Sequence, residues 1–482
     1  MLLPVISKLT GVLLTYFSIF AFLVPACVAF FYGEIEVSVF LTSFLVTFFI
    51  GAALWFYFRE AEEFRGAGGF LLTALFYVGL GLFGALPLIL STQPGLSFSD
   101  GVFESVSGLT TTGATTISGL DSLPKSILFY RHLLQWFGGM GIIVFAVAFL
   151  PVLGVGQMQL YHSEASGPDR DAKLTPRIAE SAKFLWLIYA GLTLICVISY
   201  FIAGMNLFDA ICHAFSTVAI GGFSTHDQSF QYFDLNSVKL VAIFFMIVSG
   251  INFALHFSVL KRKNPLLYLA DAEVRTYFLV LLLVSLFLVA VFQFRQSDSD
   301  ANSVDHLFQA VSFATTTGFV SSELYLWPPI AQVVLILAAF AGGCAGSTAG
   351  GIKIIRVLTI WRQGAREIKR LVHPNGVFHV KVGGQPVTEP VLNSIWSFVS
   401  VYIFLFFFSI VLIMTVSDLD FLTSFSAVSA SLNNLGPGLG MVGESYEDIS
   451  APVKWILIIN MMLGRLELFT ILVLFTPYYW RR

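Results

Sequence analysis

The sequence predicts an all-α integral membrane protein built around one pore, and three observations lead to that class. The 482 residues are 57% hydrophobic and only 11% charged, with a mean hydropathy of +0.83, far from soluble-domain averages. Hydrophobic runs of about 20 residues recur, long enough to cross the hydrocarbon core as helices. A short glycine-bearing motif recurs between these runs. We therefore expect two N-terminal spans plus four parallel span–pore helix–span repeats with pseudo-fourfold symmetry around one pore.

The elements follow from the positions of the hydrophobic runs. Residues 1–66 hold two extra spans, near 9–32 and 36–57, and the first is too long to be a signal-peptide core. The four repeats are predicted over 67–178, 179–272, 273–388 and 389–482. Their first spans lie near 70–91, 181–204, 276–294 and 394–416, and their second spans near 127–151, 238–260, 330–360 and 455–478. Between them, the segments near 99–109, 208–218, 304–314 and 422–431 are too short to cross and too apolar to be plain loops, which predicts re-entrant pore helices.

The motif after each pore helix has a regular spacing. It is GLTTTGATT at 108–116 and SFATTTGF at 312–319, with looser copies STVAIGGF at 216–223 and SASLNNLGP at 429–437. Aspartates precede the glycines at one separation in the first three copies (Asp100 to Gly113, Asp209 to Gly222, Asp305 to Gly318), and we expect these aspartates to be N-caps. Ser107, Ser216 and Ser312 also share one spacing. Ser429 stands one residue further from Gly436, so the fourth copy carries an insertion or aligns at Leu435 instead.

The glycine-bearing turns are candidates for an ion filter. A cation that sheds its water needs several oxygens at close range, and backbone carbonyls aimed at an axis supply them without adding full charges. Such backbone often needs positive φ, which glycine tolerates. The alternative is that small residues simply allow close helix packing. The candidate filter residues are Thr111, Thr112, Gly113, Ile220, Gly221, Gly222, Thr316, Thr317, Gly318, Asn433, Asn434, Leu435 and Gly436.

A second candidate site is the glycine-rich stretch 341–351, inside the second span of the third repeat. Its glycine spacing before Lys353 fits no phosphate-binding loop, and no strand precedes it. Poor helix propensity predicts a break in the span, and a flexible loop below a filter is a gate. The candidate gate residues are Gly342, Gly343, Gly346, Ser347, Thr348, Gly350, Gly351 and Arg465.

Arg465 is included among the gate residues because its charge falls in the middle of the last predicted span, at membrane depth. An arginine at that depth is unfavourable and is usually paired or faces water. One interpretation is a local pair with Glu467. The other places its charge near the pore, held by carbonyls of the glycine-rich loop, as a barrier to cations.

Lysine and arginine set the expected orientation. One set of loops carries most of them, and the opposite side keeps only Lys125, Arg131, Lys239, Arg295 and Lys454. Both termini are therefore predicted to be cytoplasmic, with the glycine-bearing turns dipping in from outside. Because each repeat contains two full spans, all four enter the membrane in the same direction. This parity favours a channel-like pore over an alternating-access carrier.

The chain resembles the Trk/Ktr/HKT superfamily of potassium transporters, and within it the TrkH membrane subunits of the bacterial Trk system. The matching segments are TTTGA (110–114), AIGGF (219–223), TTTGF (315–319), NNLGP (433–437), GGCAGSTAGGIK (342–353) and GRLE (464–467). The resemblance implies K⁺ as the transported ion, with no organic cofactor in this chain. It implies a bacterial inner-membrane homodimer with one pore per protomer, and a TrkA-like cytosolic ring that binds NAD or ATP and regulates opening.

Other classes of protein are less well supported. A carrier that couples K⁺ to Na⁺ or H⁺ remains an alternative, although few acidic residues lie within the spans to relay protons. An intramembrane enzyme would need a catalytic constellation, and none stands out, so we expect no enzyme and no nucleic-acid partner. Isolated polar residues are expected to be packing or pore-wall groups: Gln135, His213, Asn252 and His256. The basic segment 353–370 is either a docking surface for the ring or ordinary positive charge of the cytoplasmic side.

Overall fold

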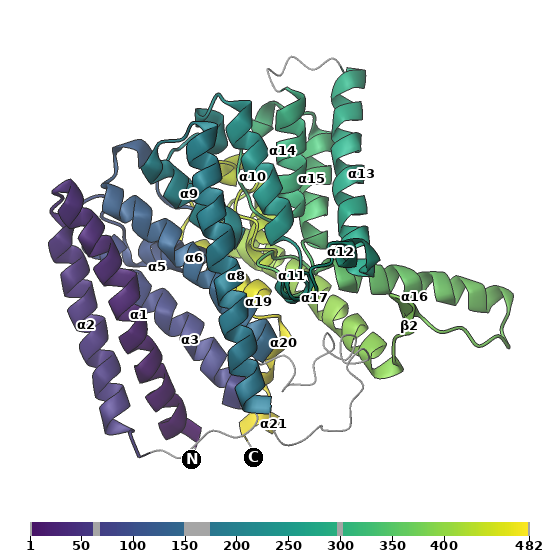
Figure 1. Ribbon diagram of the computed structural model, residues 1–482, viewed down its shortest axis with the longest axis horizontal. Coiled ribbons are helices and arrows are strands. Elements are labelled where there is room, and N and C mark those ends of the chain that lie inside the picture. Colours follow the sequence, from purple (N-terminus) through teal and green to yellow (C-terminus); the bar gives the residue numbers. More distant parts are fainter. Residues whose placement is uncertain (1, 61–67, 149–173, 296–301, 481–482) are drawn as a thin grey trace.

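The structure is a computed structural model that describes residues 2–60, 68–148, 174–295 and 302–480, and these residues are predominantly helical (Figure 1). The all-α class is therefore confirmed. Helices α1 (Leu2–Tyr32) and α2 (Glu36–Tyr57) form an antiparallel pair at one side of the molecule, and α1 also packs on α3 and α6. The start of α1 and the last helix, α21 (Pro477–Trp480), lie at the same edge in Figure 1.

The rest of the chain follows the predicted cycle of elements. The first spans are α3 (Gly68–Gly84) with α4 (Leu86–Leu90), α8 (Leu174–Ala203), α13 (Ala272–Arg295) and α17 (Glu389–Val416). The half-helices are α5 (Phe98–Leu109), α9 (Leu207–Ala219), α14 (Ser303–Ala314) and α18 (Phe421–Leu432), each within one residue of its predicted bounds. The second spans begin with α6 (Lys125–Ala148), α10 (Asn236–Ser249), α15 (Pro329–Ala341) and α19 (Ala451–Arg465).

Further elements, most of them short, connect these helices. They are α11 (Phe253–Arg262), α12 (Leu266–Ala270), α16 (Ile354–Val372), α20 (Phe469–Leu472), the 3-10 turns η1 (Leu120–Ser122), η2 (Ser229–Tyr232), η3 (Leu324–Leu326), η4 (Gly440–Val442) and η5 (Val473–Phe475), and the strands β1 (Lys381–Val382) and β2 (Gln385–Pro386). The two strands pair antiparallel, with Lys381 opposite Pro386. Helix α16 extends sideways from the helical bundle (Figure 1).

Three second spans are broken, two of them where continuous helices were predicted. The expected span 238–260 bends by 90° between α10 and α11, because the side chain of Asn252 caps α11 by accepting from the Ala254 N–H at 2.8 Å. The expected span 455–478 bends by 107° after Arg465, and Glu467 there has a φ of +56°. The span 330–360 stops at Ala341, as its glycine content predicted. Within the described residues, six helices are long and apolar enough to cross a membrane, or eight if each bent pair counts as one span.

The half-helices are capped by residues other than those predicted. Ser97, Asn206 and Asn302 are the N-caps, and their side chains accept from the backbone N–H of the aspartate three residues later. The predicted N-cap aspartates therefore stand in the first turn, where a negative charge favours the positive end of the helix dipole. Asn302 and Asp305 bond reciprocally as a capping box.

The second span of each repeat packs on the half-helix of the next one. α6 contacts α9, α10 contacts α14, α15 contacts α18, and α19 returns to contact α5. Two ion pairs lie on this cycle, Lys239 with Asp305 at 2.7 Å and Lys454 with Asp100 at 2.6 Å. The cycle brings all four half-helices around one centre.

The structure corrects the role of some charges that were predicted to mark the outer side. Arg131, Lys239 and Lys454 are buried, and each is paired with a carboxylate on a half-helix. They stabilise the packing of the repeats instead of lying in loops. Part of the charge pattern used for orientation falls outside the described residues: Arg65, Arg170, Lys173, Asp298, Asp300, Arg481 and Arg482.

Candidate functional site

The four glycine-bearing turns after the half-helices share one backbone conformation. We call them turn one (110–113), turn two (219–222), turn three (315–318) and turn four (433–436). Each ends in a glycine with a φ of +82°, +81°, +83° or +100°, in chain order. The residue two positions earlier is also left-handed although it is not glycine, with a φ between +50° and +64°: Thr111, Ile220, Thr316 and Asn434. Residues other than glycine rarely adopt this backbone conformation, and such backbone strain concentrates at functional sites.

One hydrogen bond common to all four turns settles the alignment of the fourth. The residue before each glycine donates its N–H to a carbonyl near the end of the half-helix, at 2.7–2.8 Å. The acceptors are the carbonyl oxygens of Ser107, Ser216, Ser312 and Ala430. Ala430, not Ser429, is therefore the equivalent residue, and the fourth turn contains no insertion. Because the acceptor is a backbone carbonyl, the side chain at this position is free to vary.

The turns approach one another in a closed ring. At Gly113 a Cβ would overlap the carbonyl oxygen of Gly221, and at Gly222 it would overlap that of Thr317. At Gly318 it would overlap the carbonyl oxygen of Leu435. At Gly436 it would lie 2.6 Å from the carbonyl oxygen of Thr112, which closes the ring. Each glycine thus packs against the carbonyl group just before the glycine of the next turn, and only glycine fits this approach.

Most carbonyl oxygens of the ring have no donor from the protein. In the described part of the chain, no hydrogen bond reaches the carbonyl oxygens of Thr111, Thr112, Gly113, Ile220, Gly222, Thr316, Thr317, Gly318, Asn434 and Leu435. Buried carbonyls are normally paired, so a set left open in one place is available to a cation or to a ligand that donates hydrogen bonds. The C-terminal ends of four half-helices add partial negative charge at the same place. Such a ring can coordinate a cation that has shed its water.

The glycine-rich loop between α15 and α16 lies directly against the ring. Gly350 donates its N–H to the Thr316 hydroxyl at 2.7 Å, and Gly351 donates to the Asn433 carbonyl at 3.1 Å. The Thr348 hydroxyl donates to the Val218 carbonyl at the end of α9, at 3.0 Å. The loop therefore touches turn three, turn four and the half-helix before turn two.

The loop takes a fixed, buried course. Gly342 and Gly346 have positive φ, and Cys344 donates its N–H to the carbonyl of Gly250 at the α10–α11 break. The carboxylate of Glu273 on α13 accepts from the N–H groups of Ala345 at 2.6 Å and Ile355 at 3.2 Å, which fastens both ends of the loop. The sequence pattern gave no sign of Glu273, because nothing in its spacing connects it with the loop.

Arg465 reaches into the same loop. It is the last residue of α19, at the bend, and not in the middle of a continuous span as predicted. Its guanidinium donates to the carbonyls of Thr348 at 2.8 Å and Gly138 at 3.4 Å, and its side chain is buried. The local pair with Glu467 does not form, because Glu467 pairs with Arg356 at 2.8 Å. In the described residues Arg465 has no carboxylate partner, so a full positive charge stays next to the loop.

The isolated polar residues that were expected to be packing or pore-wall groups hold backbone near the site. Gln135 donates to the Gly221 carbonyl at 2.5 Å, and His213 bonds the Ser224 hydroxyl at 3.0 Å. His256 bonds the Val248 carbonyl at 3.0 Å beside the α10–α11 break. Gln135 and His213 therefore support turn two and the residues just after it, while Asn252 and His256 support the break.

A buried ring of open carbonyls among long apolar helices, with a loop and a buried arginine beside it, is typical of membrane proteins that conduct or transport cations. Comparison with known proteins gives the family. The TrkH family of cation transport proteins matches residues 36–482, and the chain belongs to that family. It is a multi-pass membrane protein.

Similar proteins match along nearly the whole chain. The Trk system potassium uptake protein TrkH of Salmonella typhimurium is 49% identical over 479 residues, which cover 99% of each protein. The Trk system potassium uptake protein TrkG of Escherichia coli is 40% identical, over 99% of this chain and 98% of the relative. The crystal structure of the potassium transporter TrkH from Vibrio parahaemolyticus superposes with a TM-score of 0.92 at 45% identity, covering all of both chains.

Proposed function

We propose that this chain takes up K⁺ through a gated, channel-like pore in the bacterial inner membrane, with both termini in the cytoplasm. The ring of open carbonyl oxygens carries the proposal, because it offers a bare alkali ion a replacement for its water. The names of the relatives, which are potassium uptake proteins of the Trk system, point to K⁺ as the ion. In this proposal the filter consists of the thirteen candidate residues of the four turns.

The gate in this proposal is the loop 342–351 together with Arg465. One hydrogen-bond cluster joins residues from all four repeats at this level: Gly138, Val218, Thr348 and Arg465. The uncompensated guanidinium opposes a cation that leaves the filter. Opening requires the loop and the arginine to separate, so that the conduction path and the charge barrier change together.

The proposed assembly is a homodimer with one pore per protomer, regulated by a TrkA-like cytosolic ring that binds NAD or ATP. Helix α16 supports this part because it leaves the bundle and exposes large apolar side chains: Trp361, Ile368, Leu371 and Val372. Its basic residues, which include Lys369 and Arg370, suit a docking partner with acidic groups. In this proposal a second copy of the chain covers the apolar face of α16, and the cytosolic ring binds its basic face.

A carrier that couples K⁺ to Na⁺ or H⁺ is the second candidate, and Glu273 favours it. This buried carboxylate contacts the loop and, among the described residues, has no basic side chain within ion-pair distance. A carboxylate that gained a proton would accept more weakly from the N–H groups of Ala345 and Ile355, which would couple protonation to the loop.

Flux in liposomes separates the two functions. The purified chain is reconstituted, and K⁺, Rb⁺ and Na⁺ fluxes are followed with only a membrane potential imposed. The channel-like proposal expects K⁺ and Rb⁺ flux without any Na⁺ or H⁺ gradient, increased or decreased by the cytosolic ring. Strict dependence on either gradient would defeat it in favour of the carrier.

A further inference from the structure

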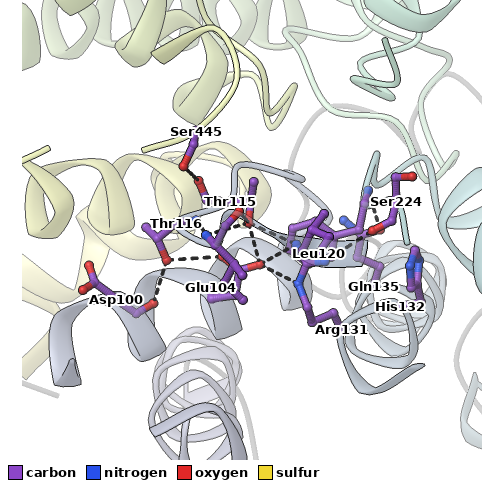
Figure 2. A network of polar contacts seen from close by, with 12 residues as sticks. Asp100, Glu104, Thr115, Thr116, Leu120, Arg131, His132, Gln135, Ser224 and Ser445 are labelled. Atoms are coloured by element: carbon purple, nitrogen blue, oxygen red, sulfur yellow. Dashed lines mark hydrogen bonds and ion pairs between the residues drawn. The ribbon is translucent and has the colours of Figure 1, made fainter. Parts of the chain in front are cut away.

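A buried ion pair lies behind turns one and two. Arg131 on α6 and Glu104 on the half-helix α5 are 1% and 0% exposed, and their side chains meet at 2.7 Å (Figure 2). Removal of either partner leaves an uncompensated charge in a dry environment, which is strongly unfavourable. Stability alone therefore does not explain an ion pair in this position, and its other contacts indicate a further role.

The two side chains bond to the segments that leave both turns. Glu104 accepts from the N–H of Thr116 at 2.9 Å, three residues after Gly113. Arg131 donates to the Thr115 hydroxyl at 3.1 Å and to the Ser224 carbonyl at 3.3 Å, two residues after Gly222. Its guanidinium also stacks over the Phe223 ring at 4.2 Å. The pair thus ties turn one to turn two (Figure 2).

Gln135 extends this contact one helical turn along α6. Its amide donates to the Gly221 carbonyl at 2.5 Å and accepts from the Phe223 N–H at 3.2 Å. Gly221 has no side chain where turns one, three and four have Thr112, Thr317 and Leu435, and a Cβ there would overlap the Gln135 amide. Gln135 therefore fills that space from a neighbouring helix.

Comparison within the chain shows that the charge is particular to the first repeat. The residue nine positions before each glycine is Glu104, His213, Gln309 or Ala427. His213 bonds Ser224, and Gln309 is placed to bond the Phe319 carbonyl at 3.2 Å and the Ser321 N–H at 3.0 Å. Neutral polar side chains thus support turns two and three from the same position, and the fourth repeat has only Ala427 there. Glu104 needs its charge because Arg131 is its neighbour.

We propose that Glu104, Arg131 and Gln135 are positioning residues that fix turns one and two against each other and so set ion discrimination. Glu104 also cancels the Arg131 charge, which would otherwise repel a cation in the ring. This inference rests on the proposed filter. Outer-shell supports of an ion site typically change ion affinity or activity by about ten- to a hundredfold when they are removed.

The test measures K⁺ and Na⁺ flux of the full chain in liposomes. Glu104→Gln leaves Arg131 unpaired, and we expect K⁺ flux to fall by about tenfold. Arg131→Gln leaves Glu104 unpaired, and we expect the ratio of K⁺ to Na⁺ flux to fall by about tenfold with K⁺ flux retained. The double variant Glu104→Gln with Arg131→Gln restores neutrality, so K⁺ flux recovers while the ratio stays low.

Two further variants control for folding. Lys239→Met breaks a buried ion pair of the same 2.7 Å length that does not bond to any turn, and we expect its K⁺ to Na⁺ ratio to be unchanged. Gln135→Ala leaves no buried charge, so it reports on positioning even if the charge variants do not fold, and we expect a lower ratio.

The outcomes keep this inference separate from the filter proposal. If Gly113→Ser lowers the K⁺ to Na⁺ ratio while the Glu104, Arg131 and Gln135 variants keep it, the positioning role is wrong and the filter stands. An equal loss in Lys239→Met also overturns the role, because any broken pair would then suffice. If Gly113→Ser and Gly318→Ser both leave the ratio unchanged, the filter itself is wrong.

Discussion

Glycine at the end of each turn is required by two independent conditions. The residue has positive φ, and its Cα lies against the carbonyl of the next turn, where a Cβ would overlap it. Some glycines with positive φ among the described residues meet only the first condition. Gly33, for example, has a φ of +69° with nothing within 4 Å of a Cβ. Substitution at a position of each kind therefore distinguishes the effect of backbone strain from the effect of a side chain that pushes the turns of the ring apart.

Replacement of Gly113 or Gly318 by serine should therefore widen the ring. The new Cβ displaces the carbonyl of Gly221 or Leu435, and we expect K⁺ over Na⁺ discrimination to fall by about tenfold or more. Relative K⁺, Rb⁺ and Na⁺ fluxes in liposomes measure it. Gly33→Ser carries the same φ strain away from the ring and should keep the ratio. Unchanged ratios in both ring variants would count against the filter.

Arg465 is the second residue with a measurable role. Arg465→Ala removes the positive charge next to the loop and the bond to the Thr348 carbonyl, so we expect basal K⁺ flux to rise several-fold. Flux per reconstituted protein, without the cytosolic ring, measures the effect. Arg465→Lys keeps a charge and should stay closer to the original flux. Equal or lower flux in the alanine variant at normal abundance would show a structural role instead.

At the scale of elements, the sequence predicted the half-helices far better than the second spans. Each half-helix is a short apolar segment between two long hydrophobic runs that ends in a glycine-bearing turn, so its bounds were predicted to within one residue. The breaks at 250–252 and after Arg465 escaped prediction because the hydrophobic runs continue through them. The chain bends there because of a side-chain cap from Asn252 and an ion pair of Glu467 with Arg356, which is 111 residues away in sequence.

The candidate site was predicted to the same uneven degree. The turns and the loop carry their own local signature of glycine and hydroxyl residues. The supports behind them do not. Arg131 was counted among the few charges of the outer side, and nothing in the sequence connects it with its partner Glu104, which lies 27 residues away. The alignment of turn four depended on a backbone carbonyl, which no side-chain pattern reveals.

The loop between α15 and α16 gives a prediction of its own. A Cβ at Gly350 would overlap the carbonyl oxygen of Asn433 in turn four, so Gly350→Ala should push the loop away from the ring and raise basal K⁺ flux several-fold. Gly364→Ala, on α16 with nothing within 4 Å, is the matched control and should keep the original flux. A loop variant that conducts no more than the control would argue against a gate here.

The loops that follow turns one and two should respond to pH. His226, in the loop between α9 and α10, bonds Asp121 and lies 3.3 Å from Asp209. Burial opposes protonation of His226, but the two carboxylates outweigh it and raise its pKa above 6.5. The stability that protonation supplies is therefore complete below 6.5 and is lost as pH rises through the raised pKa.

The corresponding measurement is the unfolding midpoint of the detergent-solubilised chain as a function of pH. We expect it to fall by about 1–2 °C as pH rises through this range, and His226→Gln should remove that component. Asp121→Asn removes one of the two partners and should shift the transition to lower pH. A transition that persists unchanged in His226→Gln would assign it to another group.

The whole molecule presents two different kinds of surface. Around the bundle, α2, α8 and α13 expose apolar side chains, as expected for helices that face lipid. Helix α16 differs because it extends away from the bundle (Figure 1). It carries both exposed apolar side chains and basic residues. An apolar face beyond the bundle needs a covering partner, and in the proposed homodimer that partner is the second copy.

Substitution on α16 tests this arrangement. Trp361 and Leu371 are 78% and 82% exposed, so Trp361→Ala with Leu371→Ala should leave the protomer fold intact and weaken the dimer about tenfold or more. Light scattering of the detergent complex over a dilution series gives the mass. Phe56→Ala on α2, 73% exposed, controls for the loss of a large apolar side chain on the lipid-facing surface. Because each proposed pore lies within one chain, the monomeric variant should still conduct K⁺ while its response to the cytosolic ring declines. A dimer that persists unchanged would move the interface away from α16 without affecting the pore.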